Sequence, residues 1–396
     1  MKISTKIAIA AQFYIALGYI ALFTSLCYLN TTATYITEQD VVSKWNNSLL
    51  LFIPFLLIYI FSLKTTSLLI ASNKPKIEFL SNQELYFLLL TTFIIVLLGY
   101  INIIISGNIP FLSAGYISRF DYLQGTKLWF YLKIFGAAFI IVPITLGFVS
   151  LHNHIRKRKY FLILTNATFI LYILYLILIG QKFGGITAGL YYFFFPRIVH
   201  SCLTKNIKIK FKHFAYALIC VITIFSLIAY HYAKLPVADE FGGPFSFIFY
   251  RLLALQGHTF WGAASKPELF PIHLWWDGMP NMMKLLGPSG IEDDIARGVR
   301  FTAGYQGILL LIFPNFIAYI IHALLCLFFS FFVAFWIVNI YKIEYLILAY
   351  VNVYLVSFFS HGSLMYLAGP KTLFLILLFI CLAFILRRGA ISRLHM

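Results

Sequence analysis

The sequence has few charged residues and very few acidic ones. Only 11% of its 396 residues are Asp, Glu, Lys or Arg, and 13 of them are acidic. A soluble domain is about a quarter charged, whereas this chain is 61% hydrophobic and 19% aromatic, with a mean hydropathy of +0.89. The scarcity of charge excludes an ordinary soluble domain and predicts a membrane protein.

Other signals are missing as well. The five cysteines lack disulfide-framework and metal-ligand spacing, and no acidic cluster resembles a divalent-ion site. The "HNH" at 152–154 looks like a metal pair but is discounted, because it lies beside the basic "RKRK". Redox chemistry, a bound metal and a cofactor therefore have no support. The formal net charge of +17 does not indicate nucleic acid, since the basic residues lie in short loops between apolar runs.

Apolar runs of about 20 residues, the length that crosses a bilayer, recur from end to end of the chain. We expect an all-α polytopic protein in which residues 1–396 form one membrane domain. The first run is too long for the core of a signal peptide and is interpreted as an uncleaved span. The ten predicted spans lie near 7–29, 48–70, 85–105, 128–150, 161–180, 186–200, 214–232, 313–341, 343–363 and 371–386.

Two predicted spans are irregular. The sixth is short and contains Pro196, which predicts a broken helix. The apolar "GILLLIF" at 307–313, before the long eighth span, predicts a separate interfacial or re-entrant element.

The densest basic clusters, "RKRK" at 156–159 and "KNIKIKFK" at 205–212, each follow an even-numbered span. Short basic loops stay in the cytoplasm, so both termini are predicted to be cytoplasmic. The outer face then carries 106–127, the "GQKFGG" at 180–185 and a long segment, 233–306. We expect short amphipathic helices in the interface for this last segment, where aromatic residues fit the depth: Phe247, Trp261, Trp275 and Trp276.

Basic side chains on the outer face suggest a substrate. No nucleotide is supplied there, so an enzyme needs a substrate activated in the membrane, and a polyprenyl-pyrophosphate-linked sugar is the obvious candidate. Fixed cations bind such a leaving group, and the planar fork of arginine suits phosphate best. The candidate cations are Arg119, Lys182, Arg251, Arg297 and Arg300.

Arg251 is the first candidate because it lies in the apolar stretch "RLLALQGHTFWG" and shares a predicted helix face with Leu255 and His258. A plainer interpretation is that it extends to lipid headgroups or pairs with Glu240. The other cations also fit plainer roles. Lys182 fits an ordinary hairpin lysine, and Arg119 fits a surface ion pair with Asp121. Arg297 and Arg300 fit a solvated helix face.

Glycosyl transfer also needs a group that takes the proton of the acceptor hydroxyl. His258 is the first choice because of the face shared with Arg251, although a structural histidine explains it equally well. The other candidates on or near the outer side, as a base or as acceptor-binding residues, are Asp277, Glu268, His273 and His361.

Three stretches carry a resemblance to a known family: "GNIPFLSAGYISRFDYLQG" after the third span, "LILIGQKFGG" before a short span, and "RLLALQGHTFWG" at the start of the main outer loop. With the topology, they resemble the Wzy-type polymerases of O-antigen and related bacterial surface polysaccharides. A family signature, an arginine and a glycine with ten residues between them, is matched by Arg251 and Gly262. A second copy is not evident.

The resemblance implies a GT-C-like fold in the bacterial inner membrane and a metal-independent glycosyltransferase at its periplasmic face, acting in lipopolysaccharide biosynthesis. The growing glycan would leave undecaprenyl pyrophosphate and join a new lipid-linked repeat unit. The pyrophosphate would be held by Arg119, Lys182, Arg251 and Arg300, with Arg251 and His258 catalytic. A polysaccharide chain-length regulator is the implied partner. The alternatives are an O-antigen ligase, which shares the architecture, and a lipid-linked oligosaccharide flippase or other transporter.

Overall fold

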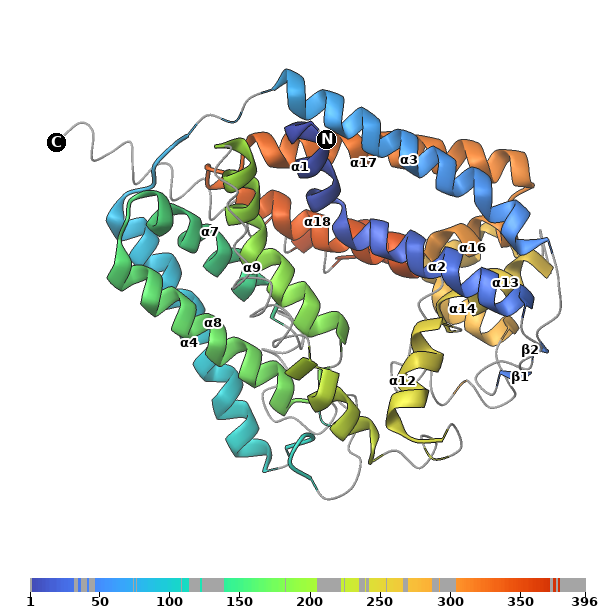
Figure 1. Cartoon of the computed structure of the whole chain (residues 1–396), viewed down its shortest axis with the longest axis horizontal. Helices are drawn as coiled ribbons and strands as arrows, with labels where there is room; N and C mark the ends of the chain where they lie inside the picture. The colour runs from blue at the N-terminus through green and yellow to red at the C-terminus, as the bar shows by residue number, and fades with distance from the viewer. Residues whose placement is uncertain are drawn as a thin grey trace. The chain divides into compact units, whose positions relative to one another are not determined.

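Helices make up most of the described part of the chain in the computed structural model (Figure 1). The chain divides into two compact units: Met1–Lys74, Ile248–Val338 and Val351–Leu377 form unit 1, and Pro75–Phe247, Asn339–Tyr350 and Leu378–Met396 form unit 2. The structure describes residues 2–31, 35–36, 41–42, 47–73, 75, 77–107, 109–113, 122, 139–181, 183–204, 222–223, 225–234, 239, 242–253, 255–265, 270–286, 292, 304–370, 373–374 and 377.

The elements of unit 1 are mostly helices that pack against α3 or α13. They are α1 (Ile3–Ala11), α2 (Phe13–Thr31), α3 (Ser48–Ser72), α13 (Leu255–Ser265), η1 (Ile272–Asp277), α14 (Gly278–Leu286), α16 (Gly304–Ile312), α17 (Asn315–Val338) and α19 (Met365–Ala368). A two-stranded antiparallel pair, β1 (Tyr35–Ile36) and β2 (Val41–Val42), joins Tyr35 to Val42 in register.

Unit 2 is built around α7, which packs against three other helices. Its elements are α4 (Asn82–Ser106), α7 (Ile141–Ile155), α8 (Lys159–Leu178) and α9 (Phe183–Leu203). Residues 225–232 are also helical. Two helices, α12 (Pro244–Leu253) and α18 (Glu344–His361), contribute residues to both units.

Five of the described helices, α2, α3, α4, α8 and α17, are long and apolar enough to cross a membrane. Each overlaps most of one predicted span. They agree with an all-α, multi-pass membrane protein. The count of ten spans and the GT-C-like fold stay predictions, because 128–138, 205–221 and 378–386 lie outside the described residues.

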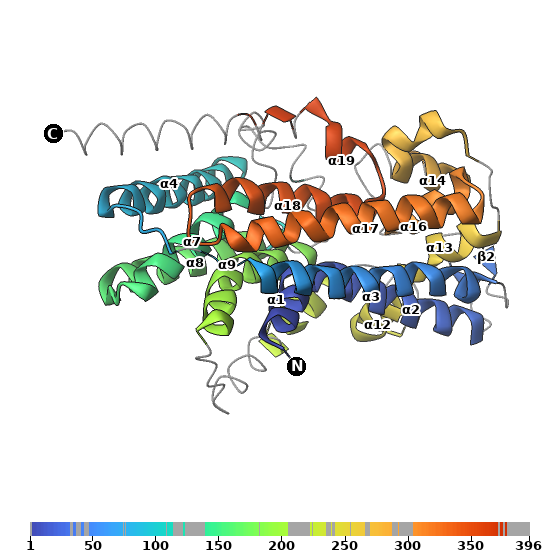
Figure 2. The ribbon, with the colours of Figure 1, turned by 90° about the horizontal axis from the view of Figure 1, so that it is seen from above.

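Small polar side chains join the two longest helices of unit 1. Figures 1 and 2 both show α3 lying along α17. Ser62 Oγ and Ser330 Oγ are 2.8 Å apart, and Ser330 Oγ also lies 3.1 Å from the Ser62 carbonyl. Ser62 and Ser330 are 4% and 0% exposed. Small residues let helix backbones approach closely, and hydrogen bonds between helices hold them there.

The first predicted span is divided at Gln12 into α1 and α2. Gln12 is buried, its side-chain Nε2 donates to Thr66 Oγ1 at 2.7 Å, and its carbonyl accepts from the Tyr59 hydroxyl at 3.4 Å. Side chains that bond into a helical ladder are an established cause of such breaks.

The prediction of a short, broken sixth span is wrong. α9 is a continuous helix of 21 residues with Pro196 inside it. Proline cannot donate the helical hydrogen bond to the carbonyl of Tyr192, and Gly147 of α7 packs against this carbonyl and that of Phe193. Close approach of a glycine backbone permits Cα–H···O contacts in that place, which is a long-range compensation that the local sequence does not reveal.

The apolar segment before α17 forms a separate helix, α16, whose residues 305–311 are buried, and its interfacial or re-entrant character stays a prediction. Tyr305 at its start hydrogen-bonds His322, which lies two turns into α17, so α16 runs back along the beginning of α17. His322 Nε2 lies 2.9 Å from the Phe55 carbonyl. Because a carbonyl can only accept, Nε2 carries the proton and Nδ1 accepts from Tyr305.

Two of the aromatic residues expected in the membrane interface are buried in the protein instead. Phe247 is 3% exposed and Trp261 is 5% exposed. Trp261 lies in α13, which packs against α2 and α16. The segment 242–286 does form short helices, but α13 belongs to the core of unit 1. Trp276 is 47% exposed, and its place at the depth of the membrane interface stays a prediction.

The replacement Gly147→Ala is expected to destabilise the protein by about 1–3 kcal/mol. A Cβ at Gly147 would overlap the Tyr192 carbonyl oxygen and lie 2.8 Å from that of Phe193. Unfolding of the purified protein in detergent measures this. Gly18→Ala is the matched control, because nothing lies within 4 Å of its added Cβ, and we expect it to be roughly 0.5–1 kcal/mol more stable than wild type. Equal effects of the two changes would contradict the packing.

Candidate functional site

Two of the three stretches that carry the family resemblance meet in unit 2. The loop after α4 contacts the end of α8, where the Phe111 N–H donates to the Leu178 carbonyl at 3.2 Å. Gly180 has φ +71°, a conformation suited to glycine. A Cβ there would lie 3.4 Å from Pro110 Cβ and 3.5 Å from the His231 ring. Gly180 therefore allows three chain segments to meet.

Lys234 ties the loop after α4 in place. Its Nζ donates to the carbonyls of Phe111, at 2.8 Å, and Ser113, at 2.7 Å. The ammonium also lies 4.8 Å from the ring centroid of Tyr230, within the range of a cation–π interaction. An ammonium group has three N–H donors. Two of those of Lys234 donate to the two carbonyls, and the third has no acceptor among the described residues.

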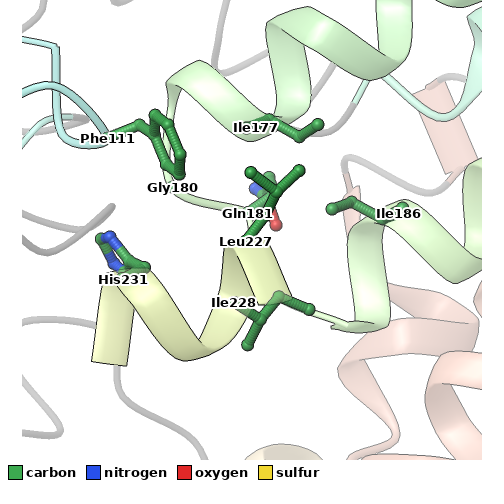
Figure 3. Close-up of a pocket in the computed structure, with 8 residues that line it drawn as sticks. All are labelled: Phe111, Ile177, Gly180, Gln181, Ile186, Leu227, Ile228 and His231. Atoms are coloured by element: carbon green, nitrogen blue, oxygen red, sulfur yellow. The ribbon is translucent and has the colours of Figure 1, made fainter. Parts of the chain in front are cut away.

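A small cavity lies between these segments (Figure 3). Its volume is about 20 Å³, which is enough for about one water molecule and too small for a sugar ring. Gln181 and His231 are its polar members, and they are 7% and 5% exposed. Its lining residues are Phe111, Ile177, Gly180, Gln181, Ile186, Leu227, Ile228 and His231.

Sequence reasoning missed Lys234, His231 and Gln181. A signal for Lys234 was present, because it is a basic residue two positions after a predicted span on the predicted outer side, where the charge bias does not place lysine. Gln181 directly precedes Lys182 in "GQKFGG". Nothing in the local pattern of His231 indicates that it would pack against Gly180.

Most of the residues named from the sequence lie outside the described part of the structure. These are Arg119, Asp121, Lys182, Glu240, Glu268, Arg297 and Arg300. Their roles stay predictions. Arg251 and His258 belong to described helices, α12 and α13, but the positions of their side chains are outside what the structure describes.

Arg251 and His258 belong to separate helices rather than to one, because α12 ends at Leu253 and α13 begins at Leu255. That their side chains share a face stays a prediction. The first N–H groups of any helix lack intrahelical partners. At the start of α13, the Gly257 N–H donates to Ser25 Oγ of α2 at 2.7 Å, and a Cβ at Gly257 would lie 2.6 Å from that oxygen. Gly257 of the "RLLALQGHTFWG" stretch thus lets Ser25 of α2 cap the start of α13.

Asp277 and His273 lie in unit 1 on the same short helix, η1, where Asp277 is half-buried and His273 is exposed. Trp275 anchors this helix: its Nε1 donates to the Gly362 carbonyl at 3.0 Å, and its own carbonyl accepts from the Leu364 N–H at 3.2 Å. His361, next to Gly362, bonds the Ser357 carbonyl through Nδ1 at 3.0 Å. Asp277 is thereby held on a fixed scaffold.

Within the described residues, no group of three His, Cys, Asp or Glu side chains could hold a metal ion. A cationic donor such as Lys234 can donate hydrogen bonds to backbone carbonyls, as it does here, or to a bound anion.

Residues 275–376 match the model of a family of unknown function, DUF6418. The match covers about a quarter of the chain and runs from η1 to beyond α19. No curated protein and no solved structure matches the chain. Of the residues named from the sequence, those within the matched segment are Trp275, Trp276, Asp277, Arg297, Arg300 and His361.

We expect Lys234→Met to destabilise unit 2 by about 2 kcal/mol, because charge-assisted hydrogen bonds contribute about 1.5–3 kcal/mol each and the two carbonyls can regain water. Amide hydrogen exchange at 109–113 should quicken. Lys159→Met is the matched control, since Lys159 is exposed, and its effect should stay within about 0.5 kcal/mol. Unchanged exchange at 109–113 in Lys234→Met would show that Lys234 does not hold this loop.

Proposed function

We propose that the protein is a membrane glycosyltransferase that polymerises lipid-linked oligosaccharide repeat units, as its resemblance to Wzy-type polymerases implies. The growing glycan is transferred from undecaprenyl pyrophosphate to the non-reducing end of a new lipid-linked repeat unit at the periplasmic face. The bond from the glycan to the pyrophosphate breaks, and a bond to an acceptor hydroxyl forms. The proton of that hydroxyl goes to a base, for which His258 is the first candidate.

One observation carries the proposal: the loop after α4 and the "GQKFGG" turn, two separate stretches of the resemblance, meet at Gly180. Phe111 of the first stretch bonds Leu178 at the edge of the second. Gln181, directly before Lys182, lines the same cavity as Phe111. A phosphate-binding surface assembled from separate loops gives one pyrophosphate several fixed cations, which is what stabilisation of a leaving group requires.

Lys234 supports the same proposal. It fixes the chain that leads to Arg119 by bonding the Phe111 and Ser113 carbonyls. Among the described residues its third N–H has no acceptor, so it can donate to a phosphate oxygen. In this scheme Arg119, Lys182, Arg251 and Arg300 hold the pyrophosphate. Lys234 acts as a positioning residue for the loop.

A transporter has less support. Transporters place charges at mid-membrane between helices, whereas Lys64, the charged residue in the interior of α3, is exposed. A lysine in that position can extend to the interface.

The decisive measurement is the length distribution of surface polysaccharide in cells that carry Arg251→Ala. We expect the long-chain ladder to collapse to a core that bears one repeat unit, because the leaving pyrophosphate loses a fixed cation. Arg158→Ala, at the opposite end of the predicted topology, should leave the ladder intact. The amount of each variant in the membrane is measured by immunoblot.

Other results of this measurement would exclude the proposed roles. An unchanged ladder with Arg251→Ala would remove Arg251 from the site. Loss of even the single-repeat band would exclude a polymerase and point to ligation or flipping.

The transfer reaction is expected to continue in EDTA, because fixed basic side chains take the place of a divalent ion at the pyrophosphate. Purified protein with lipid-linked repeat units, with and without the chelator, provides the measurement. Activity that disappears in EDTA and returns with Mg²⁺ would contradict metal independence while leaving the polymerase assignment in place.

A further inference from the structure

A second group of basic side chains lies in unit 2, where α7 and α9 end. His154 is exposed in the last turn of α7, and Arg197 and His200 are half-buried in the last two turns of α9. The ring centroids of His154 and His200 are 6.4 Å apart. Arg197 Nη1 donates to Ser150 Oγ of α7 at 3.3 Å. One guanidinium and two imidazoles thus gather at the same ends of two packed helices.

No carboxylate pairs with Arg197 among the residues that the structure describes. Its guanidinium lies 5.8 Å and 5.6 Å from the ring centroids of Phe193 and Phe194, and its hydrogen bond to Ser150 uses one of five N–H donors. Arg156 differs, because it donates to Asn82 Oδ1 at 2.7 Å and to a backbone carbonyl. A cation in apolar surroundings usually has a counter-charge, and Arg197 has none within the chain that is described.

The two histidines are arranged to contribute neutral donors. Partial desolvation, and after it the positive charge of Arg197, lower the pKa of His154 below its ordinary value, which favours the neutral ring. His200 Nδ1 bonds the hydroxyl of buried Tyr341 at 2.8 Å. The tyrosine fixes this ring, and when its hydroxyl donates to Nδ1 the ring proton lies on Nε2.

The side chains beside Arg197 indicate where a ligand comes from. Phe194 and Ile198, which lie three residues before and one after Arg197, are 37% and 48% exposed. Exposed apolar side chains on a membrane helix face lipid. The adjoining "RKRK" at 156–159 is predicted to lie at the cytoplasmic surface, where anionic lipids concentrate and where basic pockets between helices bind their headgroups.

We propose that Arg197, His154 and His200 bind the phosphate of an anionic phospholipid headgroup at the ends of α7 and α9. Arg197 supplies the charge and a planar pair of donors that match phosphate oxygens, and the histidines supply neutral N–H donors. The site lies apart from the cavity at Gly180 and does not depend on the polymerase assignment.

The test is the affinity of the purified full-length protein for phosphatidylglycerol and for zwitterionic phosphatidylcholine, measured by native mass spectrometry. Wild type is expected to prefer phosphatidylglycerol. Arg197→Gln should weaken phosphatidylglycerol binding roughly tenfold, because a charge-assisted hydrogen bond to the headgroup phosphate contributes about 1.5 kcal/mol. It should weaken phosphatidylcholine binding less, because the choline cation neutralises that phosphate.

Arg158→Gln is the matched control. Arg158 lies at the same end of the helices and also stacks on a phenylalanine, 6.0 Å from the Phe161 ring centroid, but it is not part of the histidine cluster. It should retain the wild-type preference. A preference that survives in Arg197→Gln, or falls equally in both variants, would overturn the proposal.

Two further measurements complete the test: a lysine variant checks that the effect is not a failure to fold, and competition with inorganic phosphate checks that the ligand is a lipid. If Arg197→Gln does not fold, Arg197→Lys takes its place, and an unchanged affinity for phosphatidylglycerol in that variant would overturn the proposal, because lysine lacks the planar fork. Inorganic phosphate at the concentration of the lipid should not displace phosphatidylglycerol. Displacement would overturn the lipid assignment and indicate a soluble phosphate compound.

Discussion

The constraint on which this structure depends is that polar groups surrounded by apolar helices must find their partners inside the protein. Ser62 and Ser330 bond each other across α3 and α17, and Gln12 bonds Thr66 where α1 meets α2. His322 joins the Phe55 carbonyl to α16 through its two ring nitrogens. The break at Gln12 and the short helices α13 and α16 are each accompanied by such a bond, so these irregularities are stabilised rather than merely tolerated.

Glycines supply the complementary condition, which is close approach of backbones. Gly147 meets the α9 carbonyls next to Pro196, and Gly257 brings the start of α13 against Ser25. Gly180 serves a different purpose, because its positive φ turns the chain where two loops converge. In all three positions a side chain would either overlap a neighbour or strain the backbone, so these glycines fix which segments can touch.

Among the described basic residues, some are held by strong bonds to the chain and others make only weak contacts with it. Lys234 bonds two backbone carbonyls and Arg156 bonds Asn82 and a carbonyl, so both have structural roles that charge counting does not distinguish from ligand binding. Arg197 has a weak bond to one serine hydroxyl and two aromatic neighbours. Partner geometry, rather than charge alone, therefore separates an anchoring cation from one that is suited to an external anion.

The sequence by itself determined the membrane class, the positions of α2, α3, α4, α8 and α17, and the separate α16, because the length and polarity of an apolar run are local properties. It also marked the two loops that meet at Gly180. Only the tertiary structure decided that α9 continues through Pro196, that Trp261 is buried, and that α12 and α13 are separate helices. These outcomes depend on partners such as Gly147 and Ser25, which are distant in sequence, and no local pattern encodes a contact between distant residues.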